Sequence, residues 1–350
     1  MRVAINGFGR IGRAIYRANN SNPALDIVVI NDANPDKKNI FYTLKYDTLY
    51  GTLDEIKLDG DYIHNEKFNS KTKILSDSDI NNINWSSFDI DYLIEATGVV
   101  KNVKESKALI SKQIVKKVFC TFSPSIEDFT FVMGCNEHEY DLDKHNLIST
   151  SICDATALAP ILQMINDTFG INKGYITTLH PWLSYQNLLD GPSSSWSVPG
   201  DIYHHYALGR SNIGNIIPKP TSAVEVALKS TKNIDPKKIG SFSYRTPTSI
   251  VCSADLSLNI KKNSSKSEII DLFTNYQKNQ KFNIFNNIID PLVSLDFLRT
   301  PYSCNLDHRW TDVLDNNFLK LVLWYDNEWG YSLRVLDIIS YINSKLYEKN

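Results

Sequence analysis

A glycine motif at the start of the chain constrains the fold most. Residues 2–6 predict a short buried strand, and Gly7-Phe8-Gly9-Arg10-Ile11-Gly12 follows directly and opens a helix. In this G-x-G-x-x-G pattern the first glycine makes a tight turn, the second lets a pyrophosphate approach the backbone, and the third lets helix and strand pack closely. The motif therefore predicts a dinucleotide site with contacts from Gly7, Phe8, Gly9, Arg10 and Ile11.

Two later strand ends extend this predicted site. Residues 26–30 form a second apolar run that ends at Asn31-Asp32. An acid at this position hydrogen-bonds the ribose hydroxyls and repels a 2′-phosphate, so Asp32 predicts NAD rather than NADP. The alternative is that Asp32 only shapes a turn. A further strand, residues 91–95, leads to Thr97-Gly98, and the switch-point rule places such a strand end beside the cofactor.

The remainder of the first half continues an alternation of strands and helices. We expect a helix at 101–112 and strands at 114–120 and 129–133, which is typical of a doubly wound α/β sheet, the Rossmann fold. The polar segments 63–70 and 76–87 predict loops or short hairpins.

Composition excludes several classes of protein. A chain of 350 residues predicts two domains, and a net charge of −2 argues against a nucleic-acid partner. The five cysteines are widely spaced and include no C-x-x-C pair, so neither disulfides nor a zinc site is expected. The acidic segment 136–141 is interpreted as a solvated loop, not a metal site. With no signal peptide and no apolar run of about 18 residues, we expect a cytoplasmic protein without a membrane span.

Cys153 stands at what the pattern predicts to be a helix start. Ser151 has the character of an N-cap and Asp154 could bond back to it, ahead of an apolar run that starts at Leu158. Unpaired N–H groups and the positive end of the helix dipole favour a thiolate, the form of cysteine that attacks carbonyl carbon. The alternative is a small buried hydrophobic residue.

The second half predicts an α+β domain. A strand at 174–179 delivers His180 at its end, and strand-like runs follow at 240–245, 249–260 and 318–325, with one helix at 265–278. Strands in succession with few helices between them indicate a mostly antiparallel sheet. An amphipathic helix over about 330–346 is expected to return to the first domain. The expected domains are therefore 1–151 with 327–350, and 152–326.

Taken in order, these segments resemble glyceraldehyde-3-phosphate dehydrogenase and its erythrose-4-phosphate dehydrogenase relatives. The resemblance covers essentially the whole chain. It rests on the motifs at residues 6–13, 45–48, 95–99, 149–160, 177–180, 190–192, 215–218, 244–248 and 324–331.

The resemblance implies NAD, a homotetramer and a thioester mechanism on an aldehyde substrate. By correspondence Cys153 is the nucleophile, His180 accepts its proton, and Asn327 orients the nicotinamide carboxamide. Thr121 joins the implied cofactor contacts. Arg210 and Arg245 match arginines that grip the substrate phosphate and the attacking phosphate.

The chain departs from the family around the nucleophile. Where the family has S-C-T-T-N-C, this chain has Ile152-Cys153-Asp154-Ala155-Thr156-Ala157. Ile152 donates no side-chain hydrogen bond and Asp154 repels a phosphate dianion, so we expect water or another nucleophile to release the acyl group. The alternative for Asp154 is a simple capping acid that points away from the pocket.

A second departure concerns the substrate phosphate. Leu183 and Tyr185 replace two family threonines, which suggests an altered substrate, while core packing is the alternative for this segment. Thr221 still matches a phosphate-site threonine, but Ser222 stands where glycine is usual. The loop at 193–208 is longer than in the family and carries Trp196, Tyr203, His204, His205 and Tyr206. Its aromatic residues are interpreted as interface core or as a substrate wall, and an interface is favoured over a metal site for His204-His205.

Three functions follow from these patterns. The first is oxidation of glyceraldehyde 3-phosphate or a related aldehyde through a Cys153 thioester. The second is a sugar-phosphate or other aldehyde dehydrogenase that releases the free acid without phosphate. The third, from another class, is an NAD-binding paralogue with a regulatory or binding role.

Overall fold

The computed structural model describes residues 1–193 and 206–349, and these residues form two compact units. The first unit contains residues 1–131, 139–151 and the chain from Ser332 onward, and the second contains 132–138 and 152–331. Relative to the expected domains, the segments 132–138 and 327–331 lie with the second unit. The expectations for Trp196, Tyr203, His204 and His205 fall outside the described residues.

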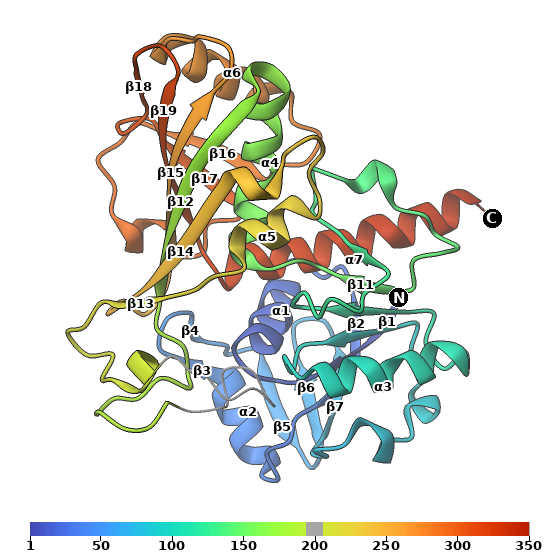
Figure 1. Cartoon of the computed structure of the whole chain (residues 1–350). Coiled ribbons are helices and arrows are strands. Elements are labelled where there is room, and N and C mark those ends of the chain that lie inside the picture. The colour runs from blue at the N-terminus through green and yellow to red at the C-terminus, as the bar shows by residue number, and fades with distance from the viewer. Residues whose placement is uncertain (194–205, 350) are drawn as a thin grey trace. The chain divides into compact units, whose positions relative to one another are not determined.

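The first unit is built on a mostly parallel sheet with helices, as expected for a Rossmann fold (Figure 1). Its strand order among the described residues is β10-β11-β9-β8-β1-β2-β7-β6-β5, and only the β5-β6 and β6-β7 pairs are antiparallel. The sheet strands are β1 (Arg2–Asn6), β2 (Asp26–Asn31), β5 (Ile56–Asp59), β6 (Tyr62–Asn65), β7 (Ser70–Leu75), β8 (Tyr92–Glu95), β9 (Lys117–Cys120), β10 (Phe129–Thr130) and β11 (Leu147–Ser149). The helices are α1 (Arg10–Ser21), α2 (Lys37–Lys45) and α3 (Val100–Ser111), and β3 (Tyr46–Asp47) pairs with β4 (Gly51–Thr52) apart from the sheet.

Three parallel strands bring the predicted cofactor residues to one edge of this sheet. β1 lies between β2 and β8, and in the register Asn6 is opposite both Asn31 and Glu95. The side chains of Val3, Ala4 and Ile5 are fully buried, so this register is fixed by the core. The turns that follow the three strands therefore start at the same edge.

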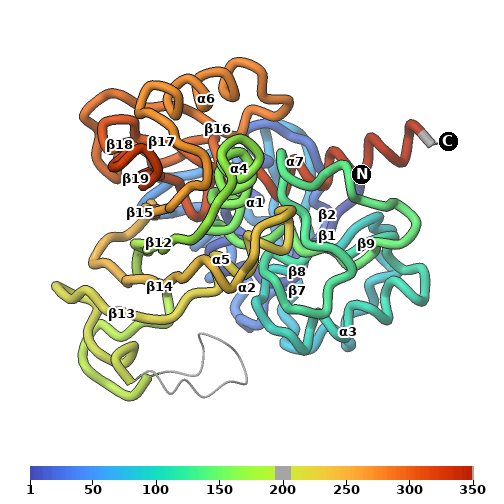
Figure 2. Tube along the Cα trace, turned by 45° about the horizontal axis from the view of Figure 1, so that its top comes forward, coloured from blue at the N-terminus to red at the C-terminus, as the bar shows by residue number. Residues whose placement is uncertain are grey.

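The second unit is built on a mostly antiparallel sheet, as expected. The strand order among the described residues is β13-β14-β12-β15-β19-β17-β16, with β18 paired to β19, and only β12-β14 and β16-β17 are parallel (Figure 2). Its strands are β12 (Ile171–Pro181), β13 (Ile217–Lys219), β14 (Ile239–Thr246), β15 (Cys252–Ile260), β16 (Phe285–Ile288), β17 (Cys304–Asp307), β18 (Asp312–Leu314) and β19 (Phe318–Tyr325). Its helices are α4 (Cys153–Phe169), α5 (Ala223–Leu228) and α6 (Lys266–Asn279), and α4 packs on β12, β15 and β19.

Several segments differ from the sequence prediction in extent. The strand expected at 129–133 is limited to Phe129–Thr130, and 63–70 contains the end of β6 and the first residue of β7. The last helix, α7 (Trp329–Lys349), continues from Ser332 as part of the first unit, where the Tyr341 ring lies 5.9 Å from the Phe131 ring. None of the described helices is long and apolar enough to cross a membrane.

Candidate active site

The nucleophile candidate lies on the first residue of α4. The N-cap is Ile152, with extended backbone, and no side chain caps the helix. The predicted capping by Ser151 is wrong, because Ser151 has a φ of +66° and lies outside the helix. The Ile152 side chain consequently does not cap the first-turn N–H groups of α4, and such groups can hold a developing oxyanion.

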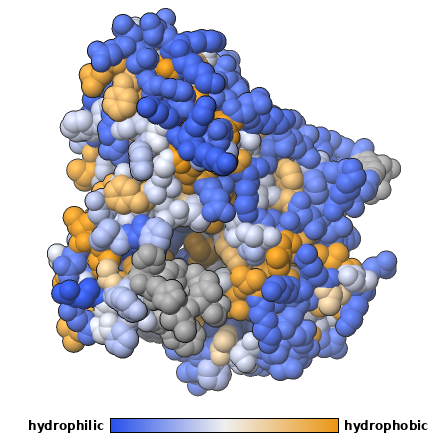
Figure 3. Space-filling view, viewed as in Figure 1, coloured by the Kyte–Doolittle hydropathy of each residue, from blue (hydrophilic) through white to orange (hydrophobic). Residues whose placement is uncertain are grey.

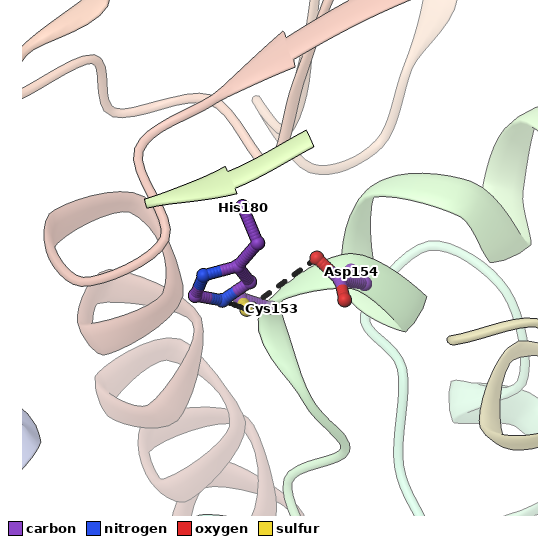
Figure 4. A group of neighbouring side chains, drawn as sticks. All are labelled: Cys153, Asp154 and His180. Atoms are coloured by element: carbon purple, nitrogen blue, oxygen red, sulfur yellow. Dashed lines mark hydrogen bonds between the residues drawn. The ribbon is translucent and has the colours of Figure 1, made fainter. Parts of the chain in front are cut away.

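Cys153, Asp154 and His180 converge in the second unit (Figure 4). The Cys153 Sγ lies 3.9 Å from His180 Nε2 and 3.8 Å from Asp154 Oδ1. All three ligand-type atoms lie within 4.8 Å of one another. Asp154 is 6% exposed and accepts a hydrogen bond of 2.6 Å from the Tyr325 hydroxyl, so it does not point away from the site as a capping acid would.

The tautomer of His180 follows from its other partner. Nδ1 lies 2.8 Å from the Pro181 carbonyl oxygen, which can only accept, so Nδ1 carries the hydrogen. The lone pair of Nε2 then faces Cys153. Burial, followed by the nearby Arg245 charge, lowers the pKa of His180 to about 4. The imidazole is therefore neutral at pH 7 and available as a proton acceptor.

Strand register gathers further side chains on the same face of the sheet. Arg245 is opposite His180 across β14 and β12, and Cys252 is opposite Tyr325 across β15 and β19. Lys219 is opposite Ser243, two residues before Arg245, so it shares that face. Arg245 was predicted from the sequence, whereas Lys219, Cys252 and Tyr325 were not, because the strand register that places them is not local in sequence.

These three residues change the electrostatics around Cys153. Burial, together with repulsion from Arg245, lowers the pKa of Lys219 to about 8, while Asp154 and Cys153 act in the opposite direction. The Cys252 thiol contacts Cys153, and burial, followed by that contact, raises the pKa of Cys252. Burial also raises the pKa of Tyr325, so its hydroxyl stays protonated as the donor to Asp154.

The predicted substrate residues divide into two groups. Arg245 is buried and donates to the Pro181 carbonyl and to the Tyr185 hydroxyl, each at 3.2 Å, and Leu183 lies on the same turn, where its N–H donates to the Gln186 side chain. The residues of the second group have other structural roles. Arg210 is exposed and paired with Asp190 at 2.8 Å, the Thr221 hydroxyl accepts from the Ala223 N–H at the start of α5, and Ser222 is the exposed N-cap of that helix.

Asn327 is buried directly after β19. Its Oδ1 accepts a hydrogen bond of 3.1 Å from the Val251 N–H. This bond fixes the orientation of the amide, so its Nδ2 is the group that remains as a donor toward a ligand.

Three glycines of the first unit, Gly7, Gly9 and Gly12, determine whether its turn fits a dinucleotide. Gly7 has a φ of +92°, and a Cβ there would lie 2.5 Å from the Thr97 nitrogen. A Cβ on Gly12 would lie 2.2 Å from the Gly7 oxygen, so close packing requires glycine at both positions. A Cβ on Gly9 would meet nothing within 4 Å, and Gly9 is the N-cap of α1 without a side-chain cap. The open space at Gly9, at the start of α1, therefore fits a pyrophosphate, which helix N-termini hold through their backbone N–H groups.

Two backbone N–H groups orient the Asp32 carboxylate. Its Oδ2 accepts from the Phe8 N–H and its Oδ1 from the Asn34 N–H, each at 2.9 Å. These bonds orient the carboxylate and leave further lone pairs for hydroxyl groups. The Arg10 side chain donates to Asp47 at 2.5 Å.

A buried polar network connects the other strand ends. Glu95 is fully buried; it accepts from Asn6 at 2.6 Å and from both the N–H and the hydroxyl of Thr97. Asn31 donates to Asn6 Oδ1 at 2.8 Å, and the Thr121 N–H donates to the Glu95 carbonyl at 3.0 Å. Burial raises the pKa of Glu95 to about 7, although the hydrogen bonds from Asn6 and Thr97 act to lower it. The network fixes the backbone around Thr97 and Gly98, beside the glycine turn.

Known proteins match this chain along its whole length. The family model for the glyceraldehyde 3-phosphate dehydrogenase NAD binding domain matches residues 1–103, and that for the C-terminal domain matches 152–327. A glyceraldehyde-3-phosphate dehydrogenase of Phytophthora infestans is 34% identical over 346 residues, covering 98% of this chain and 99% of its own. A cytosolic one of Chlamydomonas reinhardtii is 32% identical, covering 99% and 97%. Glyceraldehyde-3-phosphate dehydrogenase 2 of Bacillus subtilis (strain 168) is also 32% identical, covering 99% and 98%. The chain therefore belongs to the glyceraldehyde 3-phosphate dehydrogenase family, whose members are NAD-dependent oxidoreductases that act on an aldehyde group.

Proposed function

We propose that the chain oxidises glyceraldehyde 3-phosphate or a related aldehyde through a covalent thioester on Cys153. The observation that carries this proposal is the pair of Cys153 Sγ and His180 Nε2, 3.9 Å apart at the uncapped start of α4. A nucleophile, a base oriented by a carbonyl and a set of helix N–H groups are the parts that acyl chemistry needs.

The chain's residues divide the first half-reaction between them. His180 Nε2 takes the thiol proton, and Cys153 Sγ forms a bond to the aldehyde carbon while the carbonyl π electrons move to oxygen. The first-turn N–H groups of α4 stabilise that oxygen, which becomes the hemithioacetal hydroxyl when His180 Nε2 gives it the proton taken from the thiol. NAD supplies a hydride acceptor when bound. As the hydride leaves the carbon, His180 accepts the hydroxyl proton, and the acyl group is left as a thioester on Cys153.

For the second half-reaction we propose water rather than phosphate as the acyl acceptor. Asp154 is buried 3.8 Å from Sγ, and Ile152 offers no side-chain donor for an anion. The Asp154 carboxylate is placed to take a proton from the attacking water. The water oxygen then bonds to the acyl carbon, the C–S bond breaks, and the Cys153 thiolate takes the proton held on His180 Nε2, with a carboxylic acid as product.

The substrate we propose carries an anionic group. Arg245 and Lys219 lie on the same sheet face as His180 and place two cations there. The Tyr185 hydroxyl, which accepts from Arg245, and the apolar Leu183 line the adjacent turn where the family has threonines. Arg210, paired with Asp190, contributes to this group only if that ion pair opens.

The deciding experiment measures reduced cofactor formed from glyceraldehyde 3-phosphate and from erythrose 4-phosphate, each with and without inorganic phosphate. We expect oxidation of at least one aldehyde without phosphate and a free acid as product. Strong dependence on phosphate with the triose would instead assign the glycolytic reaction.

The same preparation tests the alternative of an NAD-binding paralogue without catalysis. An activated nucleophile predicts that one equivalent of an alkylating agent labels Cys153 first and abolishes activity, and that aldehyde protects it. Equal labelling of Cys153 and the partly buried Cys135 would favour the binding role.

We also propose a homotetramer in the cytoplasm. Exposed apolar side chains cluster in sequence on both sides of the segment 194–205, with Leu188 and Leu189 before it and Ile213 and Ile216 after it, each more than 60% exposed. Surface hydrophobic residues otherwise occur in patches among hydrophilic ones on the face shown in Figure 3. Light scattering should give four chains, and Leu189→Asp should shift the particle toward smaller species. The cytoplasmic location is supported by five free cysteines and by the cytosolic relative.

A further inference from the structure

The side chains around the nucleophile are also a set of metal ligands. Cys153 offers a thiolate, His180 an imidazole nitrogen and Asp154 a carboxylate, which are the three ligand types that Zn²⁺ takes in proteins. Sequence spacing gave no sign of this set, because its ligands are adjacent residues at the start of α4 and a third residue at the end of β12.

The distances suit a tetrahedral ion. Bond lengths of about 2.3 Å to sulfur and about 2.0 Å to nitrogen or oxygen place tetrahedral ligands roughly 3.3–3.6 Å apart. Sγ lies 3.9 Å from Nε2 and 3.8 Å from Oδ1, and every pair lies within 4.8 Å. Side-chain shifts of about 1 Å or less bring the three atoms to bonding distance.

The groups behind the ligands are the ones a zinc site uses. His180 donates its Nδ1 hydrogen to the Pro181 carbonyl at 2.8 Å, which leaves the Nε2 lone pair directed at Sγ. The Tyr325 hydroxyl donates to Asp154 at 2.6 Å and orients the carboxylate. Metal-bound histidines almost always donate their other N–H in this way, and bound carboxylates are hydrogen-bonded in turn.

Charge favours the divalent ion despite two nearby cations. The ionised thiol and carboxylate supply two negative charges, which balance Zn²⁺. Arg245 directs two of its nitrogens at the Pro181 carbonyl and the Tyr185 hydroxyl, and Lys219 donates to the Pro220 carbonyl at 2.7 Å. Both cations therefore form hydrogen bonds with acceptors other than the three zinc ligands.

We propose that Cys153, Asp154 and His180 bind one Zn²⁺ ion as a three-ligand site with an open fourth position, and that the ion reversibly blocks the enzyme. Zinc holds the sulfur and the nitrogen that aldehyde oxidation uses, so metal and aldehyde compete. The inhibition rests on the proposed function, whereas the binding does not. Asp154, which departs from the family pattern, turns a cysteine–histidine pair into a chelating set.

The test uses the full-length protein, stripped with EDTA and desalted, with Co²⁺ as the probe and neither aldehyde nor NAD present. Wild type should bind one Co²⁺ per chain with a thiolate-to-cobalt absorption band that one equivalent of Zn²⁺ removes. Asp154→Asn and His180→Gln should weaken binding at least about tenfold, and Cys153→Ser should abolish the band. Cys135→Ser, a change of the same kind at another partly buried cysteine, should leave the band unchanged.

Tyr325→Phe keeps all three ligands and tests the support of the carboxylate, with an expected loss of about tenfold. Circular dichroism on each variant separates loss of binding from loss of fold. Absence of a sulfur band in wild type, or equal affinity in Asp154→Asn, would overturn the proposal. A protein that binds Co²⁺ but oxidises no aldehyde would refute the proposed function alone, and an active enzyme that binds no Co²⁺ would refute the zinc site alone.

Discussion

Replacing Asp154 by asparagine should change the preferred acyl acceptor from water to phosphate. Asparagine has the same shape and keeps an oxygen that can accept from Tyr325, so the change removes the charge and little else. The variant loses the group that takes a proton from water and also the charge that repels phosphate. The two acceptors should therefore respond in opposite directions.

The expected size follows from the geometry. A phosphate that attacks an acyl carbon on Sγ comes within about 6 Å of Asp154, since Oδ1 is 3.8 Å from Sγ. At an effective dielectric constant of about 20, a dianion at that distance meets a repulsion of about 5 kcal/mol. Arg245, Lys219 and solvent offset much of this energy. If about 1.4 kcal/mol remains, the rate with phosphate rises tenfold in Asp154→Asn. Loss of a general base should slow hydrolysis roughly hundredfold.

The assay follows reduced cofactor spectrophotometrically at several phosphate concentrations, in EDTA so that trace metal does not inhibit. Phosphorus NMR identifies any acyl phosphate product. Asp312→Asn removes the same charge from an exposed site on β18 and should behave as wild type. Equal stimulation of wild type and Asp154→Asn by phosphate, or conversion of all of the aldehyde to acyl phosphate by wild type, would contradict this prediction.

Three further predictions concern other residues. Burial raises the pKa of Glu95 to about 7, so the folded state holds a proton that the unfolded chain releases near pH 4.5. This difference contributes about 3 kcal/mol of stability, which should be lost as the pH rises from about 4.5 to 7. The variant Glu95→Gln should flatten this part of a profile of melting temperature against pH. Gly9→Ala should melt like wild type but bind NAD at least about tenfold more weakly by calorimetry, whereas Gly7→Ala should be destabilised by about 2 kcal/mol or more because of its positive φ and the contact at 2.5 Å. Lys219→Met should raise KM for a phosphorylated aldehyde several-fold at pH 7, with the difference from wild type disappearing above about pH 8, where Lys219 loses its charge.

The backbone of the proposed cofactor site could be predicted because its determinants are local. The spacing of Gly7, Gly9 and Gly12 encodes a turn and a helix start within six residues. In the structure Gly7 and Gly12 have no room for a Cβ, whereas Gly9 borders open space. Asp32 follows its strand directly, so one strand prediction placed it. His180 was found by the same logic, at the end of β12.

The surroundings of Cys153 were only partly predictable. The helix start was correct to within two residues, but its cap was wrong, since a serine followed by an acid three residues later fits several backbone paths and Ser151 adopts a positive φ. Lys219, Cys252 and Tyr325 come from three strands separated by up to about a hundred residues. Only the pairing of β13, β14, β12, β15 and β19 brings them to one face, and no local pattern specifies that pairing.

Three of the properties proposed here depend on one residue, Asp154. We propose that its carboxylate beside the nucleophile disfavours a phosphate dianion, activates water and completes a set of zinc ligands. All three effects depend on the same feature, the Tyr325 hydroxyl that holds Asp154 toward Sγ in place of an orientation toward solvent. Tyr325 lies in β19 opposite Cys252, so the core of the sheet fixes this orientation. A neutral residue at position 154 would leave Cys153 and His180 able to form the thioester and would remove all three effects together.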